Sequence, residues 1–289
     1  MDEPGVIAAL VVAFASTCGF ALSTSLQHRS AGLTPASVRS SFGVLRFVVT
    51  QRAWLLGIAI GGVAFVLHAL ALKLGAIALV QPIMIAGVVL AIPVRAALDR
   101  SLPSRREMGS VAITAVGLAT FLVLANPVPS TTAPDRQAAL LGTLLCLAAA
   151  AGMSAVSARA EHPRTRAMLL GVSAGILFGL VAAMIKLVVN DLGDGPAALL
   201  SSWPLWALVG AGVCGTAINQ HAYQVAPLSM SMPVLNIVDV LVAIGLGAWV
   251  FGEPPAHDPI TLVIQAAALA CMAVGLHQIA RTHKVEAYA

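Results

Sequence analysis

Charged residues are scarce in this sequence of 289 residues: Asp, Glu, Lys and Arg together make up 10% of it, and aromatic residues 5%. An ordinary globular domain carries about a quarter charged residues. Because 59% of the residues are apolar, a soluble fold of this length has too little interior to bury them. A lipid bilayer can hold them, since apolar stretches of about 20 residues each span its hydrocarbon core. The composition therefore predicts a membrane protein.

Cysteine is also rare, and familiar catalytic motifs are missing. The four cysteines, Cys18, Cys146, Cys214 and Cys271, lie singly in separate apolar segments, so they predict neither disulfides nor a metal site. The sequence has no glycine-rich phosphate loop, no HExxH motif and no paired CxxC. We therefore expect no enzyme, no catalytic residues, no cofactor and no direct use of ATP. The basic residues are scattered over short loops, which argues against a nucleic-acid partner.

Nine apolar segments are long enough to cross a bilayer. They cover residues 5–26, 53–74, 75–98, 108–126, 137–156, 167–190, 198–219, 227–250 and 257–280. The sequence thus predicts an all-α, polytopic membrane helix bundle that forms one membrane domain over residues 1–289. The moderately apolar segment Leu33 to Thr50 is the alternative tenth crossing, but it would bury Arg39 and Arg46 at about 2.5 to 3.5 kcal/mol each. We expect it to lie along the membrane surface as an amphipathic helix.

The distribution of basic residues predicts an orientation. With nine crossings, 13 of the 16 Lys and Arg residues fall on one face, which makes that face cytoplasmic. The opposite face takes acidic residues such as Asp135, Asp191, Glu253 and Asp258. We expect a multi-pass protein of the plasma (inner) membrane whose N-terminus lies outside and whose C-terminus is cytoplasmic.

An internal repeat relates two halves of the chain. A shift of 151 positions lays Ala71 to Leu98 over Ala222 to Trp249, and it aligns Pro82 with Pro233. In both copies a tight hairpin of two helices precedes a proline about a third of the way into the next helix. The charge distribution predicts that the copies cross the membrane in opposite directions. Such inverted-topology repeats are typical of secondary transporters that work by alternating access.

The run from Ala71 to Pro82, its partner from Ala222 to Pro233 and the Gly252-Glu253 pair resemble the EamA-type drug/metabolite transporter superfamily. The resemblance covers nearly the whole chain and implies a fold and secondary transport, but no particular substrate. Two features depart from the family pattern. Asp99-Arg100 stands where the first half would carry Gly-Glu, and the sequence has nine predicted helices where the family has ten. The basic stretch Gln27-His28-Arg29 is similar to the NIPA-type branch, which is associated with magnesium transport.

Polar residues within the apolar segments are the candidates for binding a substrate or coupling ion. Asp239 is the one acidic side chain deep inside a span, and Asn236 lies one turn earlier on the same face. Gln81 lies at a comparable depth in the first half. We expect Asp239 to bind the coupling proton or a cationic substrate. The alternative is a satisfied polar tie between helices.

Lys186 is the nearest candidate counter-charge for Asp239 and completes the set of expected binding residues. It lies about 12 Å beyond the midpoint of its own segment at 1.5 Å per residue. The sequence therefore predicts that its ammonium extends outward to the membrane surface.

Two further groups of residues are expected to serve gating and packing. His68 and Asn219 are equivalent under the repeat and fall near opposite faces, so together with His221 they are candidate gates. The alternative is that they simply meet interfacial water. A face of small residues at a spacing of four, which lets helix backbones approach closely, is formed by Gly171, Gly175 and Gly179.

The sequence as a whole predicts a secondary transporter of a small metabolite or cation, driven by the proton or ion gradient. Its first repeat half covers residues 1–126 and its second residues 137–289. The alternatives are a magnesium or other divalent-cation transporter, and a non-transporting membrane scaffold or lipid-carrier flipping subunit. The expected partners are a small solute or ion, the lipid bilayer, and a second copy or another membrane protein.

Overall fold

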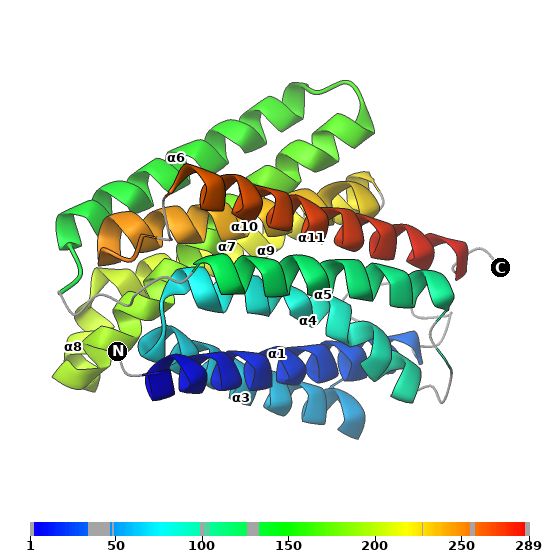
Figure 1. Cartoon of the computed structure of the whole chain (residues 1–289), viewed down its shortest axis with the longest axis horizontal. Helices are drawn as coiled ribbons and strands as arrows, with labels where there is room; N and C mark the ends of the chain where they lie inside the picture. The colour runs from blue at the N-terminus through cyan, green and yellow to red at the C-terminus, as the bar shows by residue number, and fades with distance from the viewer. Residues whose placement is uncertain are drawn as a thin grey trace.

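The computed structural model describes residues 3–33, 47, 49–98, 102, 104–125, 133–226, 228–254 and 258–286. Within these residues the chain is helical, and the long helices lie side by side in a bundle (Figure 1). They are α1 (Glu3–Gly32), α3 (Arg52–Leu74), α4 (Ile77–Leu98), α5 (Arg105–Ala125), α6 (Arg136–Arg159), α7 (Pro163–Asp191), α9 (Trp203–Val225), α10 (Leu228–Phe251) and α11 (Pro259–Glu286). A 3-10 turn, η1 (Leu192–Asp194), and the short helix α8 (Pro196–Ser201) join α7 to α9.

Seven of these helices have the length and composition needed to cross a membrane. In the described part of the chain they are α1, α3, α5, α6, α7, α10 and α11. Within α4 the apolar stretch Ile77–Gly87 is shorter. The prediction of an all-α, polytopic membrane helix bundle is therefore confirmed.

Two predicted segments need comment. The segment expected at 198–219 is helical from Trp203 to Val225 instead, because Ser202 is extended, with φ −77° and ψ 132°, and a proline follows at the start of α9. Proline is well suited to the first turn of a helix and poorly suited to its interior. The amphipathic helix predicted for Leu33 to Thr50 falls mostly on residues 34–46 and 48, which lie outside the described residues.

The long helices alternate in direction along the chain, so the bundle has two ends. We call the end where α1 begins the α1 end, and the end where α11 finishes the α11 end; they lie at the left and right of Figure 1. α1 packs on α3 and α4, and α7 packs on α9 and α10. Contacts between α5 and α11 and between α4 and α10 join the two groups.

The core of the bundle centres on α7, most of which is buried among its neighbours. By contrast, α6 lies at the periphery and exposes the apolar side chains of Leu140, Leu141, Leu144 and Leu145. An exposed apolar face of this kind suits contact with lipid. Polar groups on α7 and on the helices around it are therefore the ones that are kept away from lipid.

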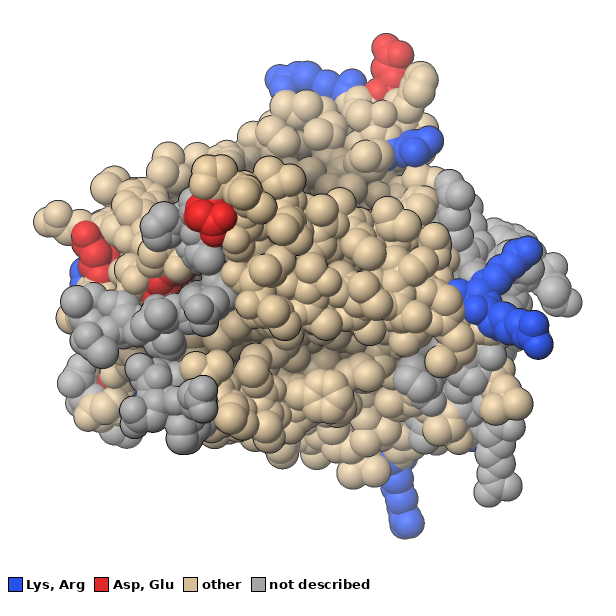
Figure 2. All heavy atoms as spheres, viewed as in Figure 1, with Lys and Arg blue, Asp and Glu red and all other residues tan. Residues whose placement is uncertain are grey.

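Charged side chains are distributed unequally between the two ends. Figure 2 shows Lys and Arg mainly towards the α11 end and Asp and Glu mainly towards the α1 end. Among the described residues, the exposed basic side chains at the α11 end include Arg29, Arg52, Arg105, Arg106, Arg159 and Arg164.

Candidate functional site

Asp239 lies midway along α10, where its backbone packs against α7. A Cβ built on Gly175 would lie 3.2 Å from the backbone nitrogen of Asp239, and one built on Gly179 would lie 2.7 Å from its backbone carbonyl oxygen. The carboxylate atom Oδ1 is buried and has no hydrogen-bond partner among the residues that the structure describes. The Oδ1 atom is therefore enclosed by the bundle without being bonded to another helix, while the residue as a whole is half-buried.

Three other buried side chains, two on α10 and one on α4, also have a polar atom without a hydrogen-bond partner among the described residues. They are Ser231 (Oγ) and Asn236 (Nδ2) on α10 and Gln81 (Nε2) on α4, with no partner in the described part of the chain. Asn236 is 8% exposed and Gln81 3%. An unsatisfied polar group in a hydrocarbon environment costs several kcal/mol. A polar solute, an ion or water could satisfy these groups, and intramembrane polar groups of this kind are usually functional.

The helices that carry these groups come from different halves of the chain and run antiparallel. At one point of contact, a Cβ built on Gly247 would lie 3.3 Å from the Cβ of Ile77. Further along, Val240 belongs to the same core cluster as Ile85. Gln81 lies between these two contacts along α4, so the candidate binding residues of both halves lie on helices that meet.

The α7 glycine face, Gly171, Gly175 and Gly179, lies against the backbone of α10. A Cβ built on these residues would approach the carbonyl oxygens of Ser231, Leu235 and Asp239 to 2.7, 2.5 and 2.7 Å respectively. Real Cβ atoms essentially never come so close, so only glycine fits at each position. The α7 glycine face therefore sets the distance between α7 and α10 along the part of α10 that carries Asp239.

Lys186 is buried and does not extend to the membrane surface, contrary to the expectation from its position in the sequence. Its Nζ donates to Glu253 Oε1 at 2.5 Å and to the Gly75 carbonyl at 2.9 Å. The side chains of Lys186 and Glu253 are 8% and 2% exposed. Lys186 Nζ also lies 5.2 Å from the centre of the Phe251 ring, which adds a cation–π attraction. The protein interior, and not the membrane surface, provides the counter-charge.

Glu253 reaches this position because of the turn that ends α10. Gly252 has φ +64°, a conformation that glycine adopts readily and other residues rarely do. The chain turns back so that the Glu253 N–H donates to the Gly247 carbonyl at 3.1 Å. Its second carboxylate oxygen, Oε2, accepts from the Ile77 N–H at 3.2 Å. Ile77 is the first residue of α4, so this carboxylate also satisfies a free amide at a helix N-terminus.

The sequence does not identify Glu253 as the partner of Lys186, because Glu253 stands among the acidic residues of the loops. The Gly252-Glu253 pair was a visible signal, since a glycine after a helix predicts a left-handed turn. The identity of the partner was not visible. Glu253 is 67 positions from Lys186 and 176 from Ile77.

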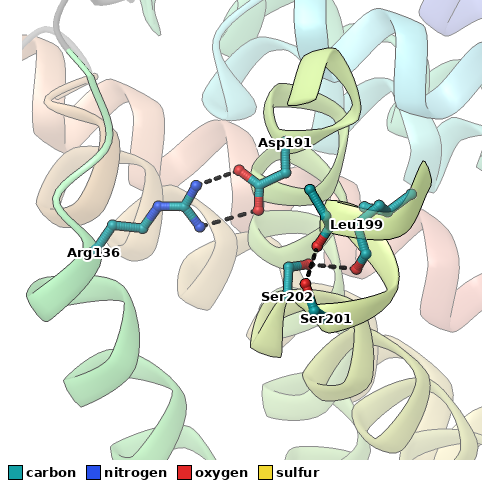
Figure 3. Close-up of polar contacts among 6 residues, drawn as sticks. Arg136, Asp191, Leu199, Ser201 and Ser202 are labelled. Carbon is teal, nitrogen blue, oxygen red and sulfur yellow. Dashed lines mark hydrogen bonds and ion pairs between the residues drawn. The ribbon is translucent and has the colours of Figure 1, made fainter. Parts of the chain in front are cut away.

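A second ion pair lies at the same end of the bundle and within the second half. Arg136, at the start of α6, forms a bidentate ion pair with Asp191, at the end of α7 (Figure 3). The preceding residue, Asp135, caps α6 by accepting from the Gln137 and Ala138 amides, and its own N–H donates to the Val250 carbonyl at 2.9 Å. The start of α6 and the ends of α7 and α10 are thus joined at the α1 end.

The candidate gate residues lie near opposite ends of the bundle. His68 is in the last two turns of α3, and its ring contacts that of Phe20 edge to face at a centroid distance of 6.5 Å. Asn219 and His221 lie near the end of α9, where His221 Nε2 is 3.2 Å from an Arg166 nitrogen. None of the three contacts Asp239 through a hydrogen bond in the described part of the chain, so these candidate gate residues are separate from the α10 polar groups.

No cluster of three or more His, Cys, Asp or Glu side chains that could hold a metal ion occurs among the described residues. The four cysteines are free thiols. The candidate site on α4 and α10 therefore offers carboxylate, amide and hydroxyl groups, while the ammonium of Lys186 pairs with Glu253.

Comparison with known proteins finds a relative of similar length. An uncharacterized protein of Corynebacterium glutamicum is 29% identical over 250 residues, and the match covers 85% of each chain. No family model matches the sequence. No solved structure matches it either.

Proposed function

We propose that the chain is a secondary transporter that moves a small metabolite or cation across the inner membrane by alternating access, driven by a proton or ion gradient. The observation that carries this proposal is the agreement of helix boundaries between the two halves. Helix α3 covers residues 52–74 and α9 covers residues 203–225, so both boundaries differ by the same 151 positions as the sequence repeat.

The turns after these two helices support the repeat further. Gly75 ends α3 in an extended conformation and donates to the Ala71 carbonyl at 2.8 Å. Ala226 ends α9 in an extended conformation and donates to the Ala222 carbonyl at 3.2 Å. Gly75 corresponds to Ala226 and Ala71 to Ala222 under the same shift of 151 positions. Because the hydrogen bond and the backbone conformation recur, the similarity extends from hydropathy to local structure.

Helix packing repeats in the same order. In one group α1 runs parallel to α4 and packs on α3 and α4, and in the other α7 runs parallel to α10 and packs on α9 and α10. Since α3 and α9 are separated by an odd number of reversals, the groups run in opposite directions. Inverted repeats suit alternating access because one unit used both ways up supports inward-open and outward-open states of similar energy. The EamA-type superfamily is the proposed family.

The charge distribution supports an orientation for this transporter. The exposed arginines gather towards the α11 end, and basic residues are enriched on the cytoplasmic side of membrane proteins. In the proposed orientation the α1 end, with the N-terminus, faces outward and the α11 end, with the C-terminus, faces the cytoplasm.

Asp239 is the proposed coupling residue. Its buried Oδ1 without a partner in the described part of the chain is suited to binding a proton or a cation, and the neighbouring Asn236 amide can contribute to the same site. The close contact between the α7 glycines and the α10 backbone would transmit a movement of α7 to this carboxylate.

The test compares Asp239→Asn with the native protein in proteoliposomes. We load the vesicles with a pH-sensitive dye, impose a proton gradient and add, one at a time, amino acids, sugars, nucleosides and quaternary ammonium ions. A magnesium indicator tests the divalent-cation alternative. Asp239→Asn is expected to keep native expression and helical content but to lose at least ten-fold in gradient-driven flux. Full accumulation by this variant would remove Asp239 from the mechanism, and no flux of any probe in the native protein would favour the scaffold alternative.

Asp258→Asn is the matched control, since it makes the same chemical change outside the bundle core. Asp258 precedes α11, and its carboxylate accepts from the Thr261 amide at 3.0 Å. The hydrogen bonds from Thr261 hold the pKa of this exposed carboxyl below its usual value, so it is ionised at neutral pH. Asparagine caps helices about as well as aspartate, and the control should keep native flux.

A further inference from the structure

The buried pair of Lys186 and Glu253 joins the two halves of the molecule at the α1 end. Lys186 belongs to α7 and Glu253 follows α10, so both charges lie in the second half. Each of them also bonds to the α3–α4 turn of the first half: Lys186 to the Gly75 carbonyl and Glu253 to the Ile77 amide. Four groups from three separate segments thus satisfy one another.

We propose that these four groups form a latch that holds the α1 end closed, and that this end opens only when Glu253 and Lys186 release the α3–α4 turn. We name the group formed by Lys186, Glu253, Gly75 and Ile77 the 186–253 latch. The inference rests on the proposed transport function, because it assigns a gate to that cycle.

Among the residues that the structure describes, the shift of 151 positions gives no equivalent of the latch at the α11 end. The counterpart of Glu253 under the shift of 151 positions is Leu102, which has no charge and is 94% exposed. The counterpart of Gly75 is Ala226. The closing device is therefore specific to one end, although the helices around both ends are related.

Two neighbouring contacts also join helices of the second half at the α1 end. The Asp135 N–H bonds to the Val250 carbonyl, three residues before Glu253, and Arg136 pairs with Asp191, five residues after Lys186. Both contacts join the start of α6 to the ends of α7 and α10, and neither of them involves the α3–α4 turn. The turn formed by Gly75 and Ile77 is then the part that can leave the latch as a unit.

A thiol reporter beneath the turn tests the latch without any transported solute. Val80 is buried on α4, and a Cβ built on Gly75 would lie 3.7 Å from one of its methyl groups. In a protein whose four native cysteines are replaced, Val80→Cys is modified by a membrane-impermeant methanethiosulfonate reagent, added from either side of oriented vesicles. With the latch intact, modification from the α1 side is expected to be slow.

The double variant Lys186→Met/Glu253→Gln removes both charges and leaves no buried charge unpaired. We expect it to raise the rate of reporter modification from the α1 side about ten-fold, which corresponds to about 1.4 kcal/mol in favour of the open end. The matched control Arg136→Gln/Asp191→Asn removes an ion pair at the same end that does not touch the α3–α4 turn, and it should leave the rate unchanged. An unchanged rate in the latch variant, or an equal rise in the control, would overturn the proposal.

A cross-link provides a second measurement that does not depend on reagent access. A Cβ at position 247 would lie 3.3 Å from that of Ile77, close to the 3.5 to 4.5 Å typical of disulfides. Ile77→Cys/Gly247→Cys should oxidise quickly with the latch intact and several-fold more slowly when Lys186→Met/Glu253→Gln is added. Equal oxidation rates would contradict the latch. Absence of solute flux in the native protein would count against the proposed function and would leave both thiol measurements unaffected.

Discussion

Lys186 illustrates how far a single membrane residue can be interpreted from sequence. Its depth predicts an ammonium near the surface, and the structure instead gives it a carboxylate, a carbonyl and an aromatic ring. Burying one charge in a membrane protein is costly, but a paired and fully hydrogen-bonded charge is stable. The relevant partner was a residue 67 positions away, and no local pattern specifies such a distance.

Stability measurements should reveal the coupling of this pair. Lys186→Met alone and Glu253→Gln alone each leave one buried charge without its counter-charge, so each should lower the free energy of unfolding by about 3 to 5 kcal/mol. The double variant should lose less than either single variant, because it leaves no unpaired charge. Unfolding in mixed micelles, followed by circular dichroism, gives these values. Simple additivity of the two losses would mean that the residues act independently.

The double variant Arg136→Gln/Asp191→Asn is the control for this cycle, because replacing both partners leaves no unpaired charge at the buried Asp191 position. The Arg136 side chain is 49% exposed, so its pairing with Asp191 is screened by solvent. We expect a loss of less than about 1 kcal/mol.

At the scale of the helices, α7 depends on glycine where it meets α10. The spacing of Gly171, Gly175 and Gly179 in the sequence identified a face for close packing, and the structure identifies α10 as the helix that lies on it. Hydropathy also predicted most helix boundaries, because apolar length decides where a chain can cross a membrane. The start of α9 was wrong because Ser202 and the proline after Trp203 impose a local backbone preference that hydropathy does not measure.

Gly175→Ala tests this packing with the smallest available change. The added Cβ would lie 2.5 Å from the Leu235 carbonyl oxygen, so α7 and α10 must separate. We expect a loss of about 1 to 3 kcal/mol in unfolding free energy. Gly152→Ala on α6 is the control, since a Cβ there meets nothing within 4 Å. Its effect should stay within about 1 kcal/mol, and equal tolerance at the two positions would remove the packing argument.

At the scale of the whole molecule, the sequence predicts which polar residues lie within the apolar segments but not how they are arranged relative to one another. Asp239, Asn236 and Gln81 were selected as polar groups within apolar segments, and each has a buried polar atom without a partner in the described part of the chain. Their relative arrangement depends on the antiparallel contact of α4 with α10. That contact joins the two halves, and hydropathy contains no information about which helices become neighbours.

The orientation of the molecule is testable with one cysteine. In a background without native cysteines, Pro4→Cys should react with an impermeant maleimide in intact cells, because the excess of basic residues at the α11 end predicts an outward α1 end. Arg159→Cys, at the end of α6, should react only after permeabilisation. If the cysteine at position 4 also needs permeabilisation, residues 33–50 cross the membrane and the protein has ten spans.

The latch also has a consequence for biosynthesis. The Gly75 carbonyl bonds to the ammonium of Lys186, which is synthesised 111 residues later. The Ile77 amide bonds to the carboxylate of Glu253, which is synthesised 176 residues later. At the usual rate of translation these intervals last on the order of 5 to 35 seconds. During that time the α3–α4 turn is in the membrane with its polar groups unpaired by protein. The first half therefore depends on lipid headgroups, water or the insertion machinery at this turn until the second half arrives and completes its hydrogen bonds.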